Sequence, residues 1–345
     1  MSIPCKLRVC WIISDGRVGN DKQSQALAHY LQKQLSLKLR TFQVALKQPW
    51  RALSPRFRLL SKWAMPEELL EALDLETPDL LIACGRQAAL VSCFIKRHSK
   101  GKTQTIQILN PYIDAKHFDV LVSPLHDRLE TSNKVSTLGS LHKIDEESLG
   151  LARQVWQGDL EKLERPRIAI LIGGSNKTYQ IDKDYILKMK ECVNEVRRQY
   201  AAHHNIPDVP LGHLMISTSR RTSQALKDCV DKVFEGERVF NVAKCTENPY
   251  EGVLAWADAI VVSAESVNMI SESLGTGKPV FSSPPVFDQS KFSHFHQSLL
   301  DEGSLLAFDA AQSVRIFEHS YKVMQEAERA AGEIIKMLGV NDCDS

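Results

Sequence analysis

One stretch of this sequence constrains the fold more than any other. Ala257 to Ser273 is typical of a buried strand, a polar turn and a helix. Ile260 to Val262 is a β-branched run of the kind found inside parallel sheets. Ser263 and Ser266 follow, and either hydroxyl can cap a helix. That helix is expected to end at Gly275.

This stretch indicates an anion site. A helix that begins at the carboxyl edge of a parallel sheet directs unpaired backbone N–H groups into the crevice, where they bind anions, phosphate above all. Glu272 lies about two turns into the helix, so its carboxylate could accept from a hydroxyl of the molecule that carries the phosphate. The same residues also suit a plain strand–loop–helix unit whose polar side chains only cap. Both interpretations stay open at this point.

The pattern of strand, glycine-containing loop and helix occurs in both halves of the chain, at Leu7 to Ile13 and again at Arg167 to Ile172. A length of 345 residues also exceeds what one core usually holds. We therefore expect an α/β protein of two Rossmann-like domains, 1–164 and 165–310, whose parallel sheets face a central cleft. Residues 311–345 are expected to form a terminal helix that returns to the first domain.

Composition excludes several function classes. A formal net charge of +1 creates no field that would attract nucleic acid. The eight cysteines are scattered without a CxxC pair or a Cys/His spacing that suits zinc, which favours a reducing compartment. No apolar run approaches the roughly 20 residues of a membrane-spanning helix. We therefore expect a cytoplasmic protein without a metal cofactor.

Residues 47–63 interleave cations with aromatic and aliphatic side chains and contain no acidic residue. This composition suits contact with a membrane surface or a lipid phosphate, so the protein could be peripheral to a membrane. The simpler interpretation is a pair of helical turns that pack their aromatic rings inward and leave the cations in water.

Two further loops in the second half suit phosphate. The loop that starts with Gly173 and Gly174 and ends at Lys177 could cradle a phosphate with backbone N–H groups. After the next long strand, Ser219 and Arg220 belong to a run of hydroxyls and arginines that matches phosphate oxygens. In the first half, polar residues also follow the strands. They are Asp15, Gly16, Arg17, Gly19 and Asn20 in the first loop, Arg86 after the third strand, and His126 with Asp127 after the fifth.

These residues together resemble a known family, named after the plant elongated-mitochondria (mitochondrial fission) protein, whose bacterial members are described as candidate glycosyltransferases. The match runs in order across nearly the whole chain. It is carried by Ser14-Asp15-Gly16-Arg17-Val18-Gly19-Asn20, Gly85-Arg86, Ser123-Pro124-Leu125-His126-Asp127, Leu171-Ile172-Gly173-Gly174, Ser217-Thr218-Ser219-Arg220-Arg221-Thr222, Asn248-Pro249-Tyr250 and the stretch from Ala257 through Val280.

The resemblance implies a GT-B-like fold whose second domain holds a nucleotide-sugar donor. Gly173 and Gly174 would then lie against the diphosphate, and Arg220 would contact phosphate or ribose. Ser266 and Asn268 would present the helix N-terminus to the diphosphate, while Glu272 would accept from ribose hydroxyls. Enzymes of this type generally need no metal, because the helix end and the arginines stabilise the charge on the departing nucleotide.

The first domain would face a glycan or lipid-linked acceptor. Asp15 is the candidate general base on this interpretation. Some GT-B enzymes carry a histidine after the glycines of this loop, whereas here Asn20 follows Gly19. Because asparagine is no base, His126 and Asp127 are the alternative catalytic pair.

Three hypotheses follow. The first is a metal-independent glycosyltransferase that uses a nucleotide sugar. The second is a non-catalytic adaptor that recruits a protein partner, as the family's fission role suggests. The third is a sugar-nucleotide epimerase with two Rossmann-like domains. The presence of Asp15, Gly173, Gly174, Arg220 and Glu272 favours retained ligand binding over the adaptor.

Overall fold

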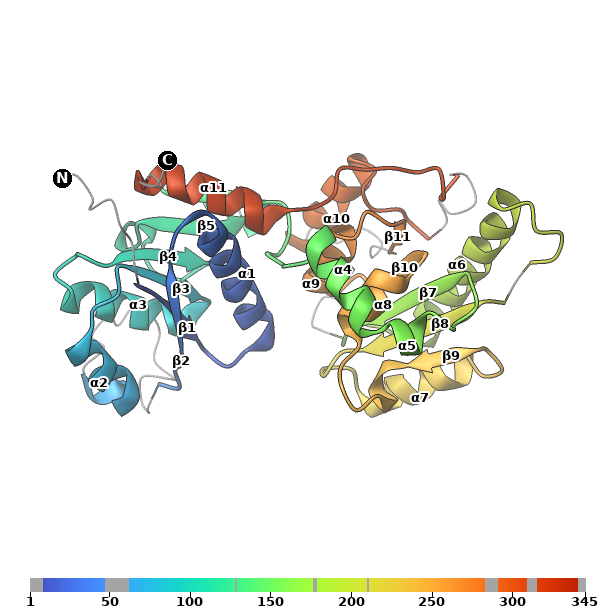
Figure 1. Cartoon of the computed structure of the whole chain (residues 1–345), viewed down its shortest axis with the longest axis horizontal. Coiled ribbons are helices and arrows are strands. Elements are labelled where there is room, and N and C mark those ends of the chain that lie inside the picture. Colours follow the sequence, from blue (N-terminus) through green and yellow to red (C-terminus); the bar gives the residue numbers. More distant parts are fainter. Residues whose placement is uncertain are drawn as a thin grey trace. The chain divides into compact units, whose positions relative to one another are not determined.

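A computed structural model of the protein describes residues 9–46, 62–127, 129–175, 179–209, 211–282, 291–308 and 315–340. The chain divides into two compact units (Figure 1). The first contains residues 1–143 and 325–345, and the second contains residues 144–324. Each unit is built around one parallel sheet, as the sequence predicts.

The sheet of the first unit has the strand order β2-β1-β3-β4-β5-β6. Its strands are β1 (Val9–Ser14), β2 (Lys38–Gln43), β3 (Leu80–Cys84), β4 (Gln104–Ile108), β5 (Val120–Pro124) and β6 (Lys134–Thr137). The helices are α1 (Val18–Gln34), α2 (Glu67–Leu75), α3 (Arg86–His98) and α11 (Glu326–Leu338), with short 3-10 turns η1 (Lys62–Ala64), η2 (Ala115–His117) and η3 (Leu125–Asp127).

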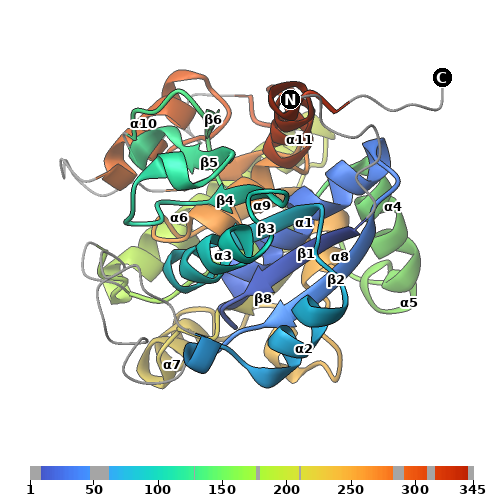
Figure 2. The ribbon, with the colours of Figure 1, turned by 90° about the vertical axis from the view of Figure 1, so that its left-hand side faces the viewer.

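This sheet has a hydrophobic core on each of its two faces, because successive side chains along a strand point to opposite faces. Cys10 and Ile12 of β1 pack with α1 and α11, whereas Trp11 and Ile13 of the same strand pack with α2 and α3. Helix α11 therefore lies beside α1 in the first unit although almost 300 residues separate them in the chain. Figure 2 looks onto this unit, with α3 in front of the strands.

The sheet of the second unit has the order β11-β10-β7-β8-β9. Its strands are β7 (Arg167–Ile172), β8 (His213–Thr218), β9 (Val239–Asn241), β10 (Ala259–Val262) and β11 (Val280–Phe281). The helices are α4 (Glu146–Val155), α5 (Gln157–Leu160), α6 (Lys183–His203), α7 (Gln224–Val233), α8 (Tyr250–Trp256), α9 (Val267–Leu274) and α10 (Lys291–Asp301), with the 3-10 turn η4 (Val242–Lys244).

The boundary between the units differs from the predicted one. The division falls between Lys143 and Ile144, not after residue 164, because α4 packs against α8 of the second unit. Arg153 of α4 donates from Nε to the carbonyl of Ala255 at 3.2 Å, and Trp256 donates from its indole to the carbonyl of Arg153 at 3.3 Å. These contacts hold α4 to the second unit, although α4 precedes β7, the first strand of that unit.

The C-terminal region also differs from the prediction. The sequence predicts a terminal helix within residues 311–345, but α11 begins only at Glu326, and residues 315–325 form turns and irregular chain. Ile316 is fully buried in the core of the second unit, and its N–H donates to the side chain of Gln199 at 3.0 Å. Met324 likewise donates its N–H to the carbonyl of Leu274 at 3.2 Å. The backbone N–H groups of Ile316 and Met324 therefore bond to the second unit and not to carbonyls of a continuing helix.

Candidate nucleotide-binding site

Three polar loops of the second unit meet at the carboxyl edge of its sheet. Strands β10, β7 and β8 are neighbours, so the loops that follow them start side by side. The N–H of Gly173 donates to Oγ of Ser263 at 2.9 Å, which joins the loops after β7 and β10. Thr222 donates from Oγ1 to the carbonyl of Gly173 at 2.7 Å, which joins the loops after β7 and β8. We call residues 173–175, 218–222 and 263–266 the loop cluster.

Close packing within the loop cluster accounts for both of its glycines. A Cβ on Gly173 would lie 1.6 Å from Oε1 of Glu265, and a Cβ on Gly174 would lie 2.4 Å from the carbonyl oxygen of Arg221. Real Cβ contacts are never this short. The glycines therefore let the loops approach one another, and their expected contact with a diphosphate stays a prediction.

Glu265 is a buried carboxylate that the sequence reasoning missed. Only 4% of the residue is exposed, and Oε1 accepts from Oγ of Ser263 at 3.1 Å. Among the described residues Oε2 has no hydrogen-bond partner. Burial raises the pKa of this carboxyl above its ordinary value, against smaller opposing effects from Ser263 and Arg221. Its place in the turn of the stretch 257–273 was the signal that could have identified it.

Helix α9 starts at the loop cluster. Ser266 is its N-cap and accepts from the N–H of Met269 at 3.4 Å, which confirms the predicted capping. Asn268 is half-buried in the first turn. The N–H of Ala264 donates to the hydroxyl of Tyr185 at 3.0 Å and fixes the preceding turn. The helix therefore directs its positive end at the carboxyl edge of the sheet.

Glu272 lies in the second turn of α9 and is inside the protein. The residue is 7% exposed, and Oε2 accepts from the hydroxyl of Tyr250 in α8 at 2.7 Å. Burial, together with the Glu272 carboxylate, raises the pKa of Tyr250 well above its ordinary value. The carboxylate predicted to accept from ribose therefore already accepts from a neighbouring helix. Of the other predicted donor residues, Ser219 is half-buried and Arg220 is exposed.

In the first unit, Asp15 and Asn20 form one hydrogen-bonded pair. Nδ2 of Asn20 lies 3.2 Å from both carboxylate oxygens of Asp15, and the N–H of Arg17 donates to Oδ1 at 3.2 Å. The side chain of Asp15 is only 3% exposed. A Cβ on Gly85 would lie 2.6 Å from Nδ2 of Asn20, so this glycine makes room for the pair. Asn20 thus orients the carboxylate.

The other predicted acceptor-side residues surround this pair. Gly16 has a φ of +75°, and a Cβ there would lie 2.9 Å from Nε2 of Gln43. The carbonyl of Gly19 accepts from Gln23 at 3.3 Å. Arg86 is exposed and begins α3 directly after Gly85.

His126 and Asp127 lie at a different place on the same edge. They form part of η3 after β5, which is the third strand from β1. At about 4.8 Å per strand, the loops after β1 and β5 start roughly 14 Å apart. His126 is 9% exposed. The structure therefore does not bring this pair together with Asp15.

Among the described residues, no group of three or more histidine, cysteine, aspartate or glutamate side chains is arranged to hold a metal ion. In the same part of the chain, no helix is both long and apolar enough to span a membrane. Residues 47–61 of the basic and aromatic segment lie outside the described residues. Of its last two residues, Trp63 is 81% exposed.

A family profile described as mitochondrial fission ELM1 matches residues 18–338. The chain belongs to the mitochondrial fission ELM1 family. The uncharacterized protein RP120 of Rickettsia prowazekii is 27% identical to this chain, over 94% of this chain and 97% of that protein. The mitochondrial fission protein ELM1 of Arabidopsis thaliana is 26% identical, over 76% of this chain and 64% of that protein. The resemblance stated from the sequence motifs is confirmed.

Solved structures with a similar fold include UDP-GlcNAc 2-epimerases. The enzyme from Methanocaldococcus jannaschii has a TM-score of 0.57 and 11% identity, over 96% of this chain and 99% of that one. The enzyme from Neisseria meningitidis bound to UDP-GlcNAc has a TM-score of 0.57 and 12% identity, over the same shares. The likeness confirms the predicted α/β fold of two Rossmann-like, GT-B-type domains in this ELM1-family chain.

Proposed function

We propose that this ELM1-family protein is a glycosyltransferase that binds a nucleotide sugar at the loop cluster and needs no metal. The observation that carries the proposal is the convergence of three polar loops and the N-terminus of α9 on neighbouring strands of one sheet. Helix N-termini and backbone N–H groups in such places bind phosphates. The solved relatives in fold include proteins bound to UDP or UDP-GlcNAc, which supports a nucleotide sugar as the ligand.

The second unit would bind the donor. The positive end of α9, capped by Ser266 and including Asn268, would stabilise the diphosphate, and the exposed guanidinium of Arg220 would add a cation. These groups would also stabilise the negative charge that develops on the departing nucleotide. The Glu272 carboxylate has acceptor capacity beyond the bond to Tyr250, which suits a ribose hydroxyl.

The first unit would supply the base. Asn20 and the N–H of Arg17 hold the carboxylate of Asp15 in one orientation, so that it could take the proton of an acceptor hydroxyl. His126 and Asp127 are the alternative, and their distance along the sheet edge means that the two proposals exclude each other. The acceptor would be a glycan or a lipid-linked sugar.

Calorimetric titration with UDP, GDP, CMP and dTDP, with and without magnesium, tests the donor site. We expect magnesium-independent binding of one nucleotide, weakened at least about ten-fold in Glu272→Gln because a charge-assisted hydrogen bond is lost. Tyr250→Phe is the matched control, since it removes the bond to Glu272 but keeps the carboxylate, and it should still bind. Failure of every nucleotide to bind the folded wild type would contradict the proposal.

Each of the two alternatives has its own test. An epimerase is favoured by the fold of the UDP-GlcNAc 2-epimerases, although that likeness concerns the fold alone. If incubation with UDP-GlcNAc converts the sugar without releasing UDP, the protein is an epimerase. Release of UDP only in the presence of an acceptor supports sugar transfer.

An adaptor is favoured by membership of the fission family. It would bind no nucleotide and would tolerate Asp15→Asn together with Glu272→Gln in a cellular fission assay.

A further inference from the structure

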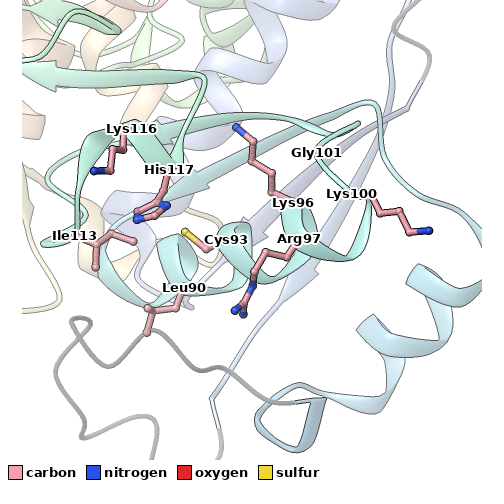
Figure 3. A pocket seen from close by; sticks show the side chains of 9 residues that line it. All are labelled: Leu90, Cys93, Lys96, Arg97, Lys100, Gly101, Ile113, Lys116 and His117. Carbon is pink, nitrogen blue, oxygen red and sulfur yellow. The ribbon is translucent and has the colours of Figure 1, made fainter.

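A groove lies along α3 in the first unit, opposite the segment that connects β4 to β5 (Figure 3). Its volume is about 470 Å³, within the range of small-molecule sites. Six lining residues come from α3 and the turn after it, and three come from the connecting segment. On the first side they are Leu90, Cys93, Lys96, Arg97, Lys100 and Gly101, and on the opposite side they are Ile113, Lys116 and His117.

One end of the groove is apolar. Leu90 and Cys93 are three residues apart on α3, so their side chains lie on the same face of the helix. Leu90 is buried, and Cys93 and Ile113 are half-buried. Figure 3 shows Leu90 and Ile113 on the side of the groove away from Lys100. Arg97 follows Leu90 by two helical turns, about 10 Å along the axis.

The remainder of the lining is cationic. Four of the lining side chains are lysines or arginine, and two nearby carboxylates pair with two of them. Nζ of Lys96 lies 2.7 Å from Asp119, and Nζ of Lys116 lies 2.8 Å from Asp114. The described lining itself includes these four cations and neither an aspartate nor a glutamate. Cationic side chains of this kind next to an apolar surface are complementary to a molecule with an anionic head and an apolar chain.

The wall opposite α3 is held in place by the protein. The side-chain amide of Asn133 donates to the carbonyls of Ala115 at 3.0 Å and Phe118 at 2.8 Å. Asp114 caps η2 by accepting from the N–H of Lys116 at 3.1 Å. Phe118 is buried directly after the turn. The groove is thus a preformed feature of the unit, as binding sites for small molecules usually are.

We propose that this groove binds a single-chain amphiphile with an anionic head group. The chain lies against Leu90, Cys93 and Ile113, and the head lies among Lys96, Arg97 and Lys100. None of these residues belongs to the loop cluster or to the pair of Asp15 and Asn20. The proposal therefore stands or falls independently of the proposed sugar transfer.

Calorimetric titration of the full-length protein with dodecyl phosphate, below its micelle concentration, tests this site. We expect saturable binding of one molecule, much weaker binding of dodecyl maltoside, and no detectable binding of inorganic phosphate. Lys100→Glu should weaken dodecyl phosphate binding about ten-fold through lost charge attraction and new repulsion. Lys102→Glu is the matched control: Lys102 is exposed, lies outside the groove, and changes the net charge equally. It should change the affinity less than about two-fold.

A second pair of variants tests the apolar end. Cys93→Phe should fill the groove and abolish binding, whereas Cys93→Ser should retain it; circular dichroism checks that both fold. Equal binding of the phosphate and maltoside amphiphiles, or equal effects of Lys100→Glu and Lys102→Glu, would overturn the proposal. So would binding of the protein only to vesicles that contain dodecyl phosphate, because the site would then be a membrane surface. Inorganic phosphate that binds as well as dodecyl phosphate would likewise overturn it.

Discussion

The carboxylate of Glu265 occupies the space that a side chain at residue 173 would need. A Cβ on Gly173 would lie 1.6 Å from Oε1 and 2.8 Å from the carboxyl carbon of Glu265. Glu265 in turn accepts from Ser263, whose hydroxyl also accepts from the N–H of Gly173. The turn before α9 and the loop after β7 are therefore packed as one unit, and neither can change without the other.

We predict that Gly173→Ala lowers the free energy of unfolding by about 1–3 kcal/mol, the usual cost of overpacking. Chemical denaturation measures this. Gly332→Ala in α11 is the control, because a Cβ there meets nothing within 4 Å. It should stabilise by about 0.5–1 kcal/mol, since alanine is the better helix former. Adding Glu265→Ala to Gly173→Ala should make the two effects strongly non-additive; additivity would show that the two residues do not press on each other.

The buried carboxyl of Glu265 should make stability depend on pH. Burial raises its pKa in the folded protein above the ordinary 4.5, so above that pH the folded state retains a proton that the unfolded state has released. The stability that the folded protein has while the Glu265 carboxyl is neutral is therefore fully present at low pH, and it is lost as the pH rises through the raised pKa of that carboxyl. We predict that Glu265→Gln, compared with wild type, gains stability between pH 4.5 and 8. A difference between the two proteins that is constant with pH would contradict this.

Gly252 is the contact point that places α4 in the second unit. A Cβ there would lie 2.5 Å from Cδ1 of Trp156, the residue that follows α4. We predict that Gly252→Ala lowers the free energy of unfolding by about 1–3 kcal/mol through overpacking. Gly150→Ala within α4 is the control, because a Cβ there meets nothing within 4 Å. Gly252→Ala in a Trp156→Ala background should cost much less, and an unchanged cost would show that the ring is not the obstacle.

The side chain of Lys278, a half-buried residue after α9, reaches the C-terminal end of α8. Its Nζ donates to the carbonyls of Leu254 at 2.5 Å and Ala255 at 2.7 Å, which lie in the last turn of α8 and have no acceptor role within the helix. Burial lowers its pKa from 10.5 to about 7. Between these values the unfolded chain binds a proton that the folded protein does not, so stability rises with pH.

We predict that the stability of wild type relative to Lys278→Met increases from pH 7 to pH 10, as followed by urea denaturation at each pH. Lys188→Met, at an exposed position, should parallel wild type throughout. If the difference between wild type and Lys278→Met fell with rising pH, the lysine would be charged in the folded protein and our sign would be wrong.

Much of the secondary structure could be predicted from local sequence. The run Arg167 to Ile172 forms β7 with the predicted ends, because consecutive buried β-branched and aliphatic side chains favour an interior strand. Ser266 caps α9 because a cap requires only a hydroxyl and an N–H three residues away. The strand β6 was missed: its residues Lys134 to Thr137 are half polar and alternate in burial at the edge of the sheet, which leaves no long apolar run to recognise.

The site was predicted less completely than the fold. Sequence reasoning placed the polar loops at the ends of the right strands, because parallel strands bring their carboxyl ends to one edge. It gave Asp15 as the base and His126 with Asp127 as the alternative, and the strand order puts three intervals between the two places. It assigned Glu272 to a ribose hydroxyl, which stays a prediction, and it did not foresee that Tyr250 of another helix donates to that carboxylate.

The sequence by itself therefore determined the alternation of strands and helices, the helix caps and the family, since these depend on residues close in the chain or on ordered motifs. Only the tertiary structure decided the unit boundary at Lys143, the start of α11 at Glu326, and the partners of Glu265 and Glu272. Those features depend on which surfaces bury one another, and a contact between residues far apart in the chain leaves no local pattern in the sequence.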